Sequence, residues 1–157
     1  MEPKAGRGQA PAGRPEAQGL VIVTGAFDLL HVGHLRFLEA ARRLGDRLAV
    51  GVESDERVRR WKGPRRPVQA QEDRIELLAA LRCVDQVLLI EGERVDPPYY
   101  ADLLAPLHAR YLAVTADDPF LEAKRAAMVA VGVELRVVVP RIENHSTTRL
   151  VELLGLA

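Results

Sequence analysis

A short apolar run, residues 20–23, breaks at Gly25 and leads directly into a helical pattern that carries two histidines. A continuous apolar run of this length is typical of a strand buried on both faces of a parallel sheet. His31 and His34 are three residues apart, so we expect them on one helix face, with Gly33 leaving room for a ligand near the backbone. Because a helix N-terminus has unpaired N–H groups and a partial positive charge, this segment predicts an anion-binding site.

The same alternation of strand and helix continues along the chain. Further apolar runs lie at residues 48–52, 87–90, 111–115 and 134–139. Helical patterns lie at residues 35–44, 71–81, 99–107 and 120–131, and a last one begins at the Ser-Thr-Thr of residues 146–148. This order predicts an α/β fold with a Rossmann-like, doubly wound, five-stranded parallel sheet of strand order 3-2-1-4-5. Ligands of such folds bind at the carboxyl edge of the strands.

Composition limits the classes of partner. The chain has 157 residues with 22 basic and 22 acidic side chains, so no overall field favours nucleic acid or an anionic membrane. No apolar run is long enough to span a membrane, and the single cysteine, Cys83, fits a reducing cytoplasm. Residues 1–18 contain three prolines and three glycines, which predicts a disordered tail before one domain at residues 19–157.

A strongly basic segment follows the second predicted strand. Residues 57–66 contain six basic side chains and no acidic one: Arg57, Arg59, Arg60, Lys62, Arg65 and Arg66. Gly63-Pro64 interrupts the segment, so we interpret it as a basic loop. Trp61 is the only aromatic residue in it, which favours a polyphosphate ligand over nucleic acid.

Several motifs resemble those of the HIGH-motif nucleotidylyltransferases of the cytidylyltransferase-like superfamily. Gly25-Ala26-Phe27-Asp28 followed by His31-Val32-Gly33-His34 is similar to the GxFDxxHxGH signature of that family. Residues 51–55, 62–68, 72–74 and 84–85 follow in the order seen in bacterial heptose-phosphate adenylyltransferases and glycerol-3-phosphate cytidylyltransferases. Residues 141–148 are similar to the RTxGISTT segment of the latter enzymes.

This resemblance implies a nucleotidyltransferase that moves a nucleoside monophosphate from ATP or CTP to a small phosphorylated sugar or polyol and releases pyrophosphate. The attacking phosphate oxygen is already anionic near neutral pH, so such a site must mainly neutralise charge and align the groups. The resemblance also implies Mg²⁺ that arrives with the triphosphate, no metal site on the protein itself, and a homodimer, because relatives often pair.

By resemblance, the catalytic residues are His31, His34 and Lys62. The nucleotide-binding residues are Thr24, Gly25, Ala26, Phe27, Gly33, Asp117, Arg141, Ser146, Thr147 and Thr148. The residues expected to bind the acceptor are Asp28, Asp55, Arg74 and Asp118. Two structural alternatives stay open: Asp28 could only hold its loop in place, and residues 146–148 could only cap a helix.

The loop after the fourth strand departs from the relatives. Thr115-Ala116-Asp117-Asp118-Pro119 stands where heptose-phosphate enzymes have a Lys-Gly-Gly-Asp-Tyr-like segment and glycerol-phosphate enzymes a Gly-Asp-Asp-Trp-like one. The acceptor and the choice between ATP and CTP therefore stay open. FMN adenylylation, pantetheine-phosphate adenylylation and a nucleotide-binding module without turnover remain alternatives.

Overall fold

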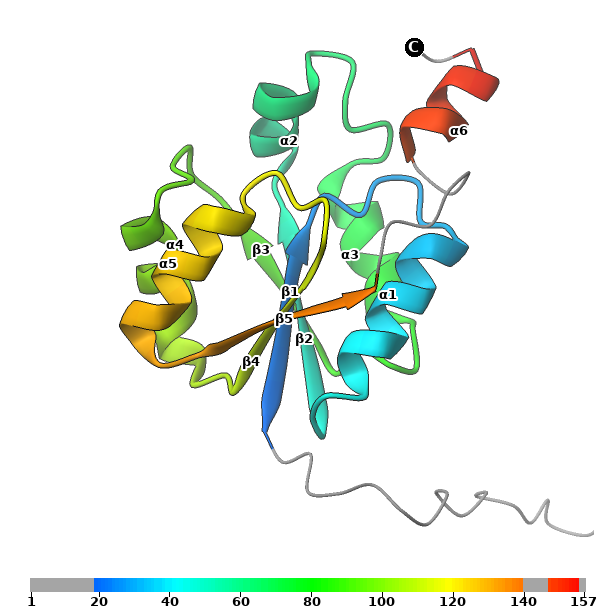
Figure 1. The fold of residues 1–157 in the computed structure, drawn as a ribbon. Coiled ribbons are helices and arrows are strands. Elements are labelled where there is room, and N and C mark those ends of the chain that lie inside the picture. Colours follow the sequence, from blue (N-terminus) through cyan, green and yellow to red (C-terminus); the bar gives the residue numbers. More distant parts are fainter. Residues whose placement is uncertain (1–18, 140–146, 156–157) are drawn as a thin grey trace, which may run out of the picture.

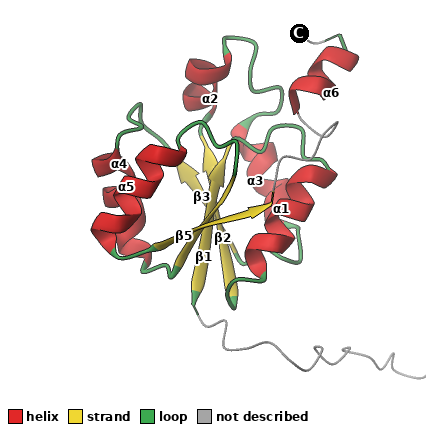
Figure 2. Cartoon of the chain, viewed as in Figure 1, coloured by secondary structure: helices red, strands yellow, loops and turns green. Residues whose placement is uncertain are grey.

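The computed structural model describes residues 19–139 and 147–155. Its five strands form one parallel sheet in the order β3-β2-β1-β4-β5. The strands are β1 (Leu20–Gly25), β2 (Arg47–Glu53), β3 (Gln86–Ile90), β4 (Tyr111–Thr115) and β5 (Glu134–Val139). The predicted fold class and strand order are confirmed, and each predicted strand forms within two residues of its expected bounds. Figure 2 shows the strands of the sheet with helices around it.

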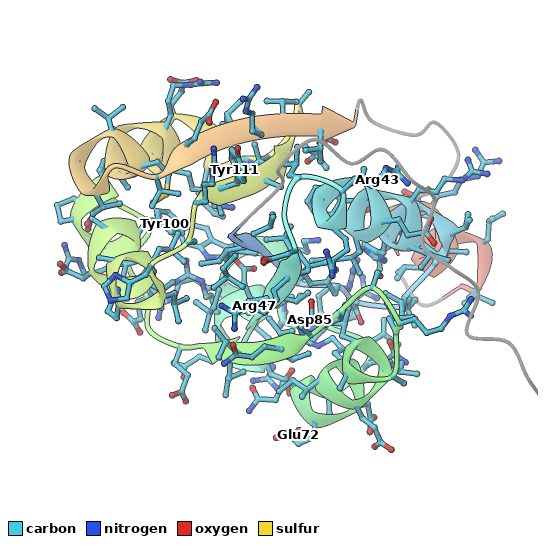
Figure 3. The ribbon with its side chains drawn as sticks, turned by 90° about the horizontal axis from the view of Figure 1, so that it is seen from below. Arg43, Arg47, Glu72, Asp85, Tyr100 and Tyr111 are labelled. Carbon is cyan, nitrogen blue, oxygen red and sulfur yellow. The ribbon has the colours of Figure 1, made fainter. Side chains whose placement is uncertain are left out.

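Helices cover both faces of the sheet (Figures 1 and 3). The helices are α1 (Val32–Arg42), α2 (Asp55–Lys62), α3 (Gln71–Ala79), α4 (Pro97–Leu104) with the short 3₁₀ turn η1 (Ala105–Leu107), α5 (Leu121–Val131) and α6 (Thr147–Leu153). One core cluster packs Leu38 of α1 and Leu78 of α3 against the sheet, and the other packs Tyr100 of α4 and Met128 of α5 against the opposite face. The fold is therefore doubly wound.

The sheet places a topological switch point at its centre. The chain runs from β1 outward to β2 and β3, and then crosses to β4 on the other side of β1. Doubly wound folds bind their ligands at the carboxyl edge of the strands at such a point. Thr24 and Gly25, at the end of β1, and Thr115, at the end of β4, lie at this edge.

The predicted basic loop is wrong for residues 57–62, because they belong to α2. Ser54 caps this helix by accepting a hydrogen bond from the Arg57 N–H at 3.3 Å. Asp55 and Glu56 occupy its first turn and basic residues its last, as the helix dipole favours, so the charged run is compatible with a helix. The helix ends at Gly63, whose φ of 93° suits glycine.

Some predictions cannot be compared with the structure. Residues 1–18, Arg141 and Ser146 lie outside the described residues, so the division of the chain at residue 18 stays a prediction. Within the described parts of the chain, no helix has the length and apolar character needed to cross a membrane.

Candidate active site

A cavity of about 390 Å³ lies at the carboxyl edge of the sheet. Thirteen of the predicted site residues line it: Thr24, Gly25, Ala26, Phe27, Asp28, His31, Gly33, His34, Lys62, Asp117, Asp118, Thr147 and Thr148. Seven residues without a predicted role complete the wall: Phe37, Glu53, Trp61, Thr115, Pro119, Phe120 and Lys124. The structure thus brings together segments that are more than 100 residues apart in the sequence.

The two histidines form a stacked pair at the start of α1. His31 is the N-cap, and its Nδ1 accepts a hydrogen bond from the Gly33 N–H at 3.0 Å. The His31 N–H in turn donates to Nδ1 of His34 at 3.3 Å. The ring centroids are 3.9 Å apart with an interplanar angle of 26°. Because each Nδ1 accepts a backbone N–H, a neutral ring in either position carries its proton on Nε2.

His34 is held in its neutral form. Burial, the neighbouring His31 and Lys62 lower the pKa of His34 to about 3. The ring of Phe27 lies 5.5 Å from the His34 ring and contributes to this burial. At physiological pH, His34 therefore offers a hydrogen bond from Nε2 without a formal charge.

Asp28 ties the β1–α1 loop to the segment after α2. Its carboxylate accepts hydrogen bonds from the backbone N–H groups of Val68 and Gln69 at 3.0 Å and from Nε of Arg66 at 2.9 Å. Burial would raise the pKa of Asp28, but these donors outweigh it and lower the pKa below its ordinary value. The side chain is 1% exposed and occupied by protein partners, which supports the structural alternative for Asp28.

Arg74 also holds the β1–α1 loop in place. It is fully buried and donates to the carbonyl oxygen of Ala26 and, at 3.1 Å, to that of Gln69. Its guanidinium also pairs with Asp55 at 2.7 Å. Neither Arg74 nor Asp55 is among the described residues that line the cavity, so their predicted contact with the acceptor stays a prediction.

The basic segment does not face the cavity as a set, because several of its side chains are held by other groups of the protein. Arg57 is 1% exposed and donates at 2.9 Å to the carbonyl oxygens of Gly92 and Arg94. Arg60 pairs with Glu93, and Arg66 pairs with Asp28. Of the six basic residues, only Lys62 lines the cavity. The Lys62 side chain is exposed to solvent. Its partial desolvation in the cavity and the nearby Arg66 nevertheless lower the pKa of Lys62.

Thr24 brings an unsatisfied hydroxyl to the cavity. Within the described residues, its buried Oγ1 has no hydrogen-bond partner. A buried hydroxyl without a partner costs free energy that a bound anion could recover. At the start of α6, the hydroxyl of Thr147 instead donates to the Asp28 carbonyl oxygen at 2.6 Å, which joins α6 to the β1–α1 loop.

The cavity wall also holds functional candidates that the sequence did not indicate. Trp61 of α2 and Phe120 meet edge to face with centroids 5.1 Å apart. Lys124 of α5 is 3% exposed, and its Nζ lies 2.6 Å from Oδ2 of Asp118. A lysine in an amphipathic helix gives no sequence signal of its own, because its partner and its cavity come from tertiary packing.

The sequence model of the family described as cytidylyltransferase-like matches residues 22–153. The chain belongs to the cytidylyltransferase-like family. The predicted resemblance and the enzyme class, nucleotidyltransferase, are thereby confirmed.

Known proteins similar to the chain agree with this assignment. The bifunctional protein HldE of Trichlorobacter lovleyi is 38% identical over 142 residues, which are 90% of this chain and 28% of that protein. HldE of Methylococcus capsulatus is 39% identical over 141 residues, 88% of this chain and 28% of that protein. The chain therefore spans little more than a quarter of the length of these relatives.

Solved structures show the same fold. A lipopolysaccharide core biosynthesis protein from Thermoplasma volcanium superposes with a TM-score of 0.62 at 26% identity, over 81% of this chain and 98% of that one. A pantothenate synthetase from Thermus thermophilus reaches a TM-score of 0.55 at 20% identity, over 80% of this chain and 57% of that one. At this low identity, the second likeness shows the fold alone.

Proposed function

We propose that the chain transfers a nucleoside monophosphate from ATP or CTP to a small phosphorylated sugar or polyol and releases pyrophosphate. The observation that carries this proposal is the stacked His31–His34 pair, which is fixed to the start of α1 through its Nδ1 atoms and lines the same cavity as Lys62. Family membership and the relatives named HldE support a sugar-phosphate acceptor in particular.

The chemistry needs positioning and charge stabilisation more than a base. An anionic oxygen of the acceptor phosphate attacks the α-phosphorus of the triphosphate, and the bond between the α-phosphorus and the bridging oxygen to the β-phosphate breaks. His31 and His34 donate hydrogen bonds from Nε2 to the oxygens of the α-phosphate as negative charge develops there. Lys62 supplies positive charge to the triphosphate, and the Thr24 hydroxyl gains an anionic partner.

The supporting contacts make this site rigid before the substrates bind. Asp28 and Arg74 hold the β1–α1 loop against the segment that follows Lys62. Phe27 and Leu29, on either side of Asp28, have φ values of 50° and 49°, which non-glycine residues rarely adopt. Such a conformation persists where surrounding contacts determine it, and it fixes the donors relative to one another.

We also propose that Mg²⁺ enters with the triphosphate. Among residues 19–139 and 147–155, no three His, Cys, Asp or Glu side chains are placed to hold a metal ion together. The carboxylates of Asp28 and Asp118 in the cavity wall already bind Arg66 and Lys124. A phosphate-bound Mg²⁺ would neutralise part of the triphosphate charge. The homodimer, the cytoplasmic location and the lack of a nucleic-acid partner stay predictions.

The test measures pyrophosphate release with ATP and with CTP against a heptose phosphate, glycerol 3-phosphate, FMN and phosphopantetheine. We expect turnover with one triphosphate and a sugar or polyol phosphate, with a nucleoside diphosphate derivative of that acceptor found by mass spectrometry. Turnover with FMN or phosphopantetheine alone would replace the proposed acceptor class. If calorimetry detects triphosphate binding but no acceptor gives pyrophosphate, the chain is a nucleotide-binding module.

A further inference from the structure

The ammonium group of Lys124 occupies a cation site at the cavity wall. Its Nζ lies 2.6 Å from Oδ2 of Asp118 and 5.5 Å from the centre of the Tyr100 ring. A carboxylate beside an aromatic face is a favourable environment for an ammonium group, because both attract positive charge. Tyr100 is 1% exposed on α4, and Figure 3 shows it among the side chains between that helix and the rest of the molecule.

This ion pair is accessible to a ligand although it is buried. Lys124 is 3% exposed, yet both it and Asp118 line the cavity. Asp118 has a second partner, because its Oδ1 accepts a hydrogen bond from the Phe120 N–H at 2.8 Å. The carboxylate would therefore stay in place if the lysine were removed.

The cavity wall carries charges of both signs. Lys62 of α2 supplies positive charge, while the nearby carboxylates of Asp28 and Glu53 are paired with Arg66 and Arg57. Asp117 and Asp118 come from the loop after β4. Without Lys124, the Asp118 carboxylate would lose its cationic partner, and an acceptor with a positively charged group would be attracted to it.

We propose that Lys124 is a specificity-determining residue: its ammonium group fills the cation site formed by Asp118 and Tyr100, and it thereby excludes acceptors with a cationic head in favour of uncharged, hydroxyl-bearing ones. The inference rests on the proposed function for the identity of the reaction. A cationic acceptor is excluded because the ammonium group of Lys124 already occupies the site where the cationic head of that acceptor would bind.

The test compares two phosphate monoesters of similar size, glycerol 3-phosphate and O-phosphoethanolamine, which differ in carrying hydroxyls or an ammonium group. In Lys124→Met, we expect the ratio of kcat/KM for phosphoethanolamine to that for glycerol 3-phosphate to rise at least about tenfold over the wild-type ratio. The KM for the triphosphate should change less than about twofold. Arg125→Met is the matched control, because Arg125 is the next residue on α5 and its exposed side chain pairs only weakly with Glu122, at 3.8 Å.

Two further variants separate the cation site from a change in folding. Lys124→Gln removes the ammonium charge but keeps a hydrogen-bond donor for Asp118, so it should show a smaller shift in the same direction, and it replaces Lys124→Met if that variant fails to fold. Lys124→Met combined with Asp118→Asn removes the carboxylate as well, so the gain for phosphoethanolamine should disappear. Circular dichroism and thermal unfolding report the fold of each variant.

A binding measurement keeps the inference independent of turnover. Ethylammonium chloride should raise the unfolding midpoint of Lys124→Met by about 2 °C or more relative to sodium chloride of equal ionic strength, and should not do so for the wild type or Arg125→Met. An unchanged midpoint, together with an unchanged acceptor ratio, would overturn the inference. A larger effect on the triphosphate KM than on the acceptor would also overturn it. If no acceptor reacts with any variant, the proposed function fails, and the ethylammonium result alone decides the role of Lys124.

Discussion

His31 and His34 hold each other in one orientation through the backbone of α1: the His31 N–H donates to Nδ1 of His34, and Nδ1 of His31 accepts the Gly33 N–H. Each ring therefore has its Nδ1 committed to the helix N-terminus, which fixes the direction of its Nε2. The capping arrangement explains why two histidines at this spacing are useful to an anion site. A variant that keeps the capping hydrogen bond but lacks Nε2 can therefore test the chemical role of a histidine separately from its structural role.

His31→Asn should keep the cap and remove the Nε2 donor, because the asparagine side-chain oxygen can accept the Gly33 N–H. We expect turnover to fall at least about a hundredfold with the unfolding midpoint almost unchanged. His31→Ala should lose similar activity and also destabilise the fold by about 1 kcal/mol. Pyrophosphate release and thermal unfolding measure the two effects, and near-normal turnover in His31→Asn would exclude the proposed mechanism.

His34 should make stability depend on pH. Its pKa is about 3 in the folded chain and near the ordinary 6.5 when unfolded, so the unfolded chain binds more protons between these values. The stability that the neutral His34 contributes is fully present above the unfolded pKa and is lost as the pH falls toward the folded pKa. The free energy of unfolding should therefore fall by about 2 kcal/mol between about pH 8 and about pH 5. Asp28 does not contribute in this window, because its lowered pKa matters only below its ordinary value of 3.8.

Denaturant unfolding at a series of pH values measures this decline. His34→Asn should show a flatter dependence than the wild type. The matched control is His108→Asn, because His108 is exposed and lies outside the cavity wall, and asparagine tolerates its φ of 48°. Equal slopes for the wild type and His34→Asn would show that His34 is not held neutral.

Asp28→Asn should loosen the β1–α1 loop, because it removes one charge from a buried pair and leaves Arg66 uncompensated. We expect the free energy of unfolding to fall by about 3 kcal/mol. Arg66→Met should cost a similar amount, and the double variant should cost less than the sum of both. Additive losses in denaturant titrations would indicate that the two side chains act independently.

Lys62→Ala should raise the KM for the triphosphate more than the KM for the acceptor, because Lys62 is the one member of the basic segment that lines the cavity. We expect an increase of about tenfold or more, the scale of one charge-assisted contact. Arg60→Ala, on the same helix but paired with Glu93, serves as the control and should leave both KM values unchanged. A larger effect on the acceptor would assign Lys62 to the acceptor side.

The sheet and the histidine pair could be predicted because their signals are local. The apolar runs at residues 20–23 and 111–115 mark buried strands without reference to any other part of the chain. The spacing of His31, Gly33 and His34 likewise sets their relation within one helix turn. Helix α2 does not follow from the same signals, because its run of basic side chains favours a basic loop, although Ser54 and Asp55 carry an ordinary helix start.

By itself, the amino-acid sequence determined the doubly wound sheet, its strand-to-helix turn with two histidines, and the family. Only the tertiary structure decided which charged side chains face the cavity and which serve the scaffold. The partners that make this division are far apart in the sequence: Arg66 is 38 residues from Asp28, and Arg74 is 48 residues from Ala26. Whether a charge is available to a ligand depends on whether folding has already given it a partner, and a pattern of residue types does not contain that information.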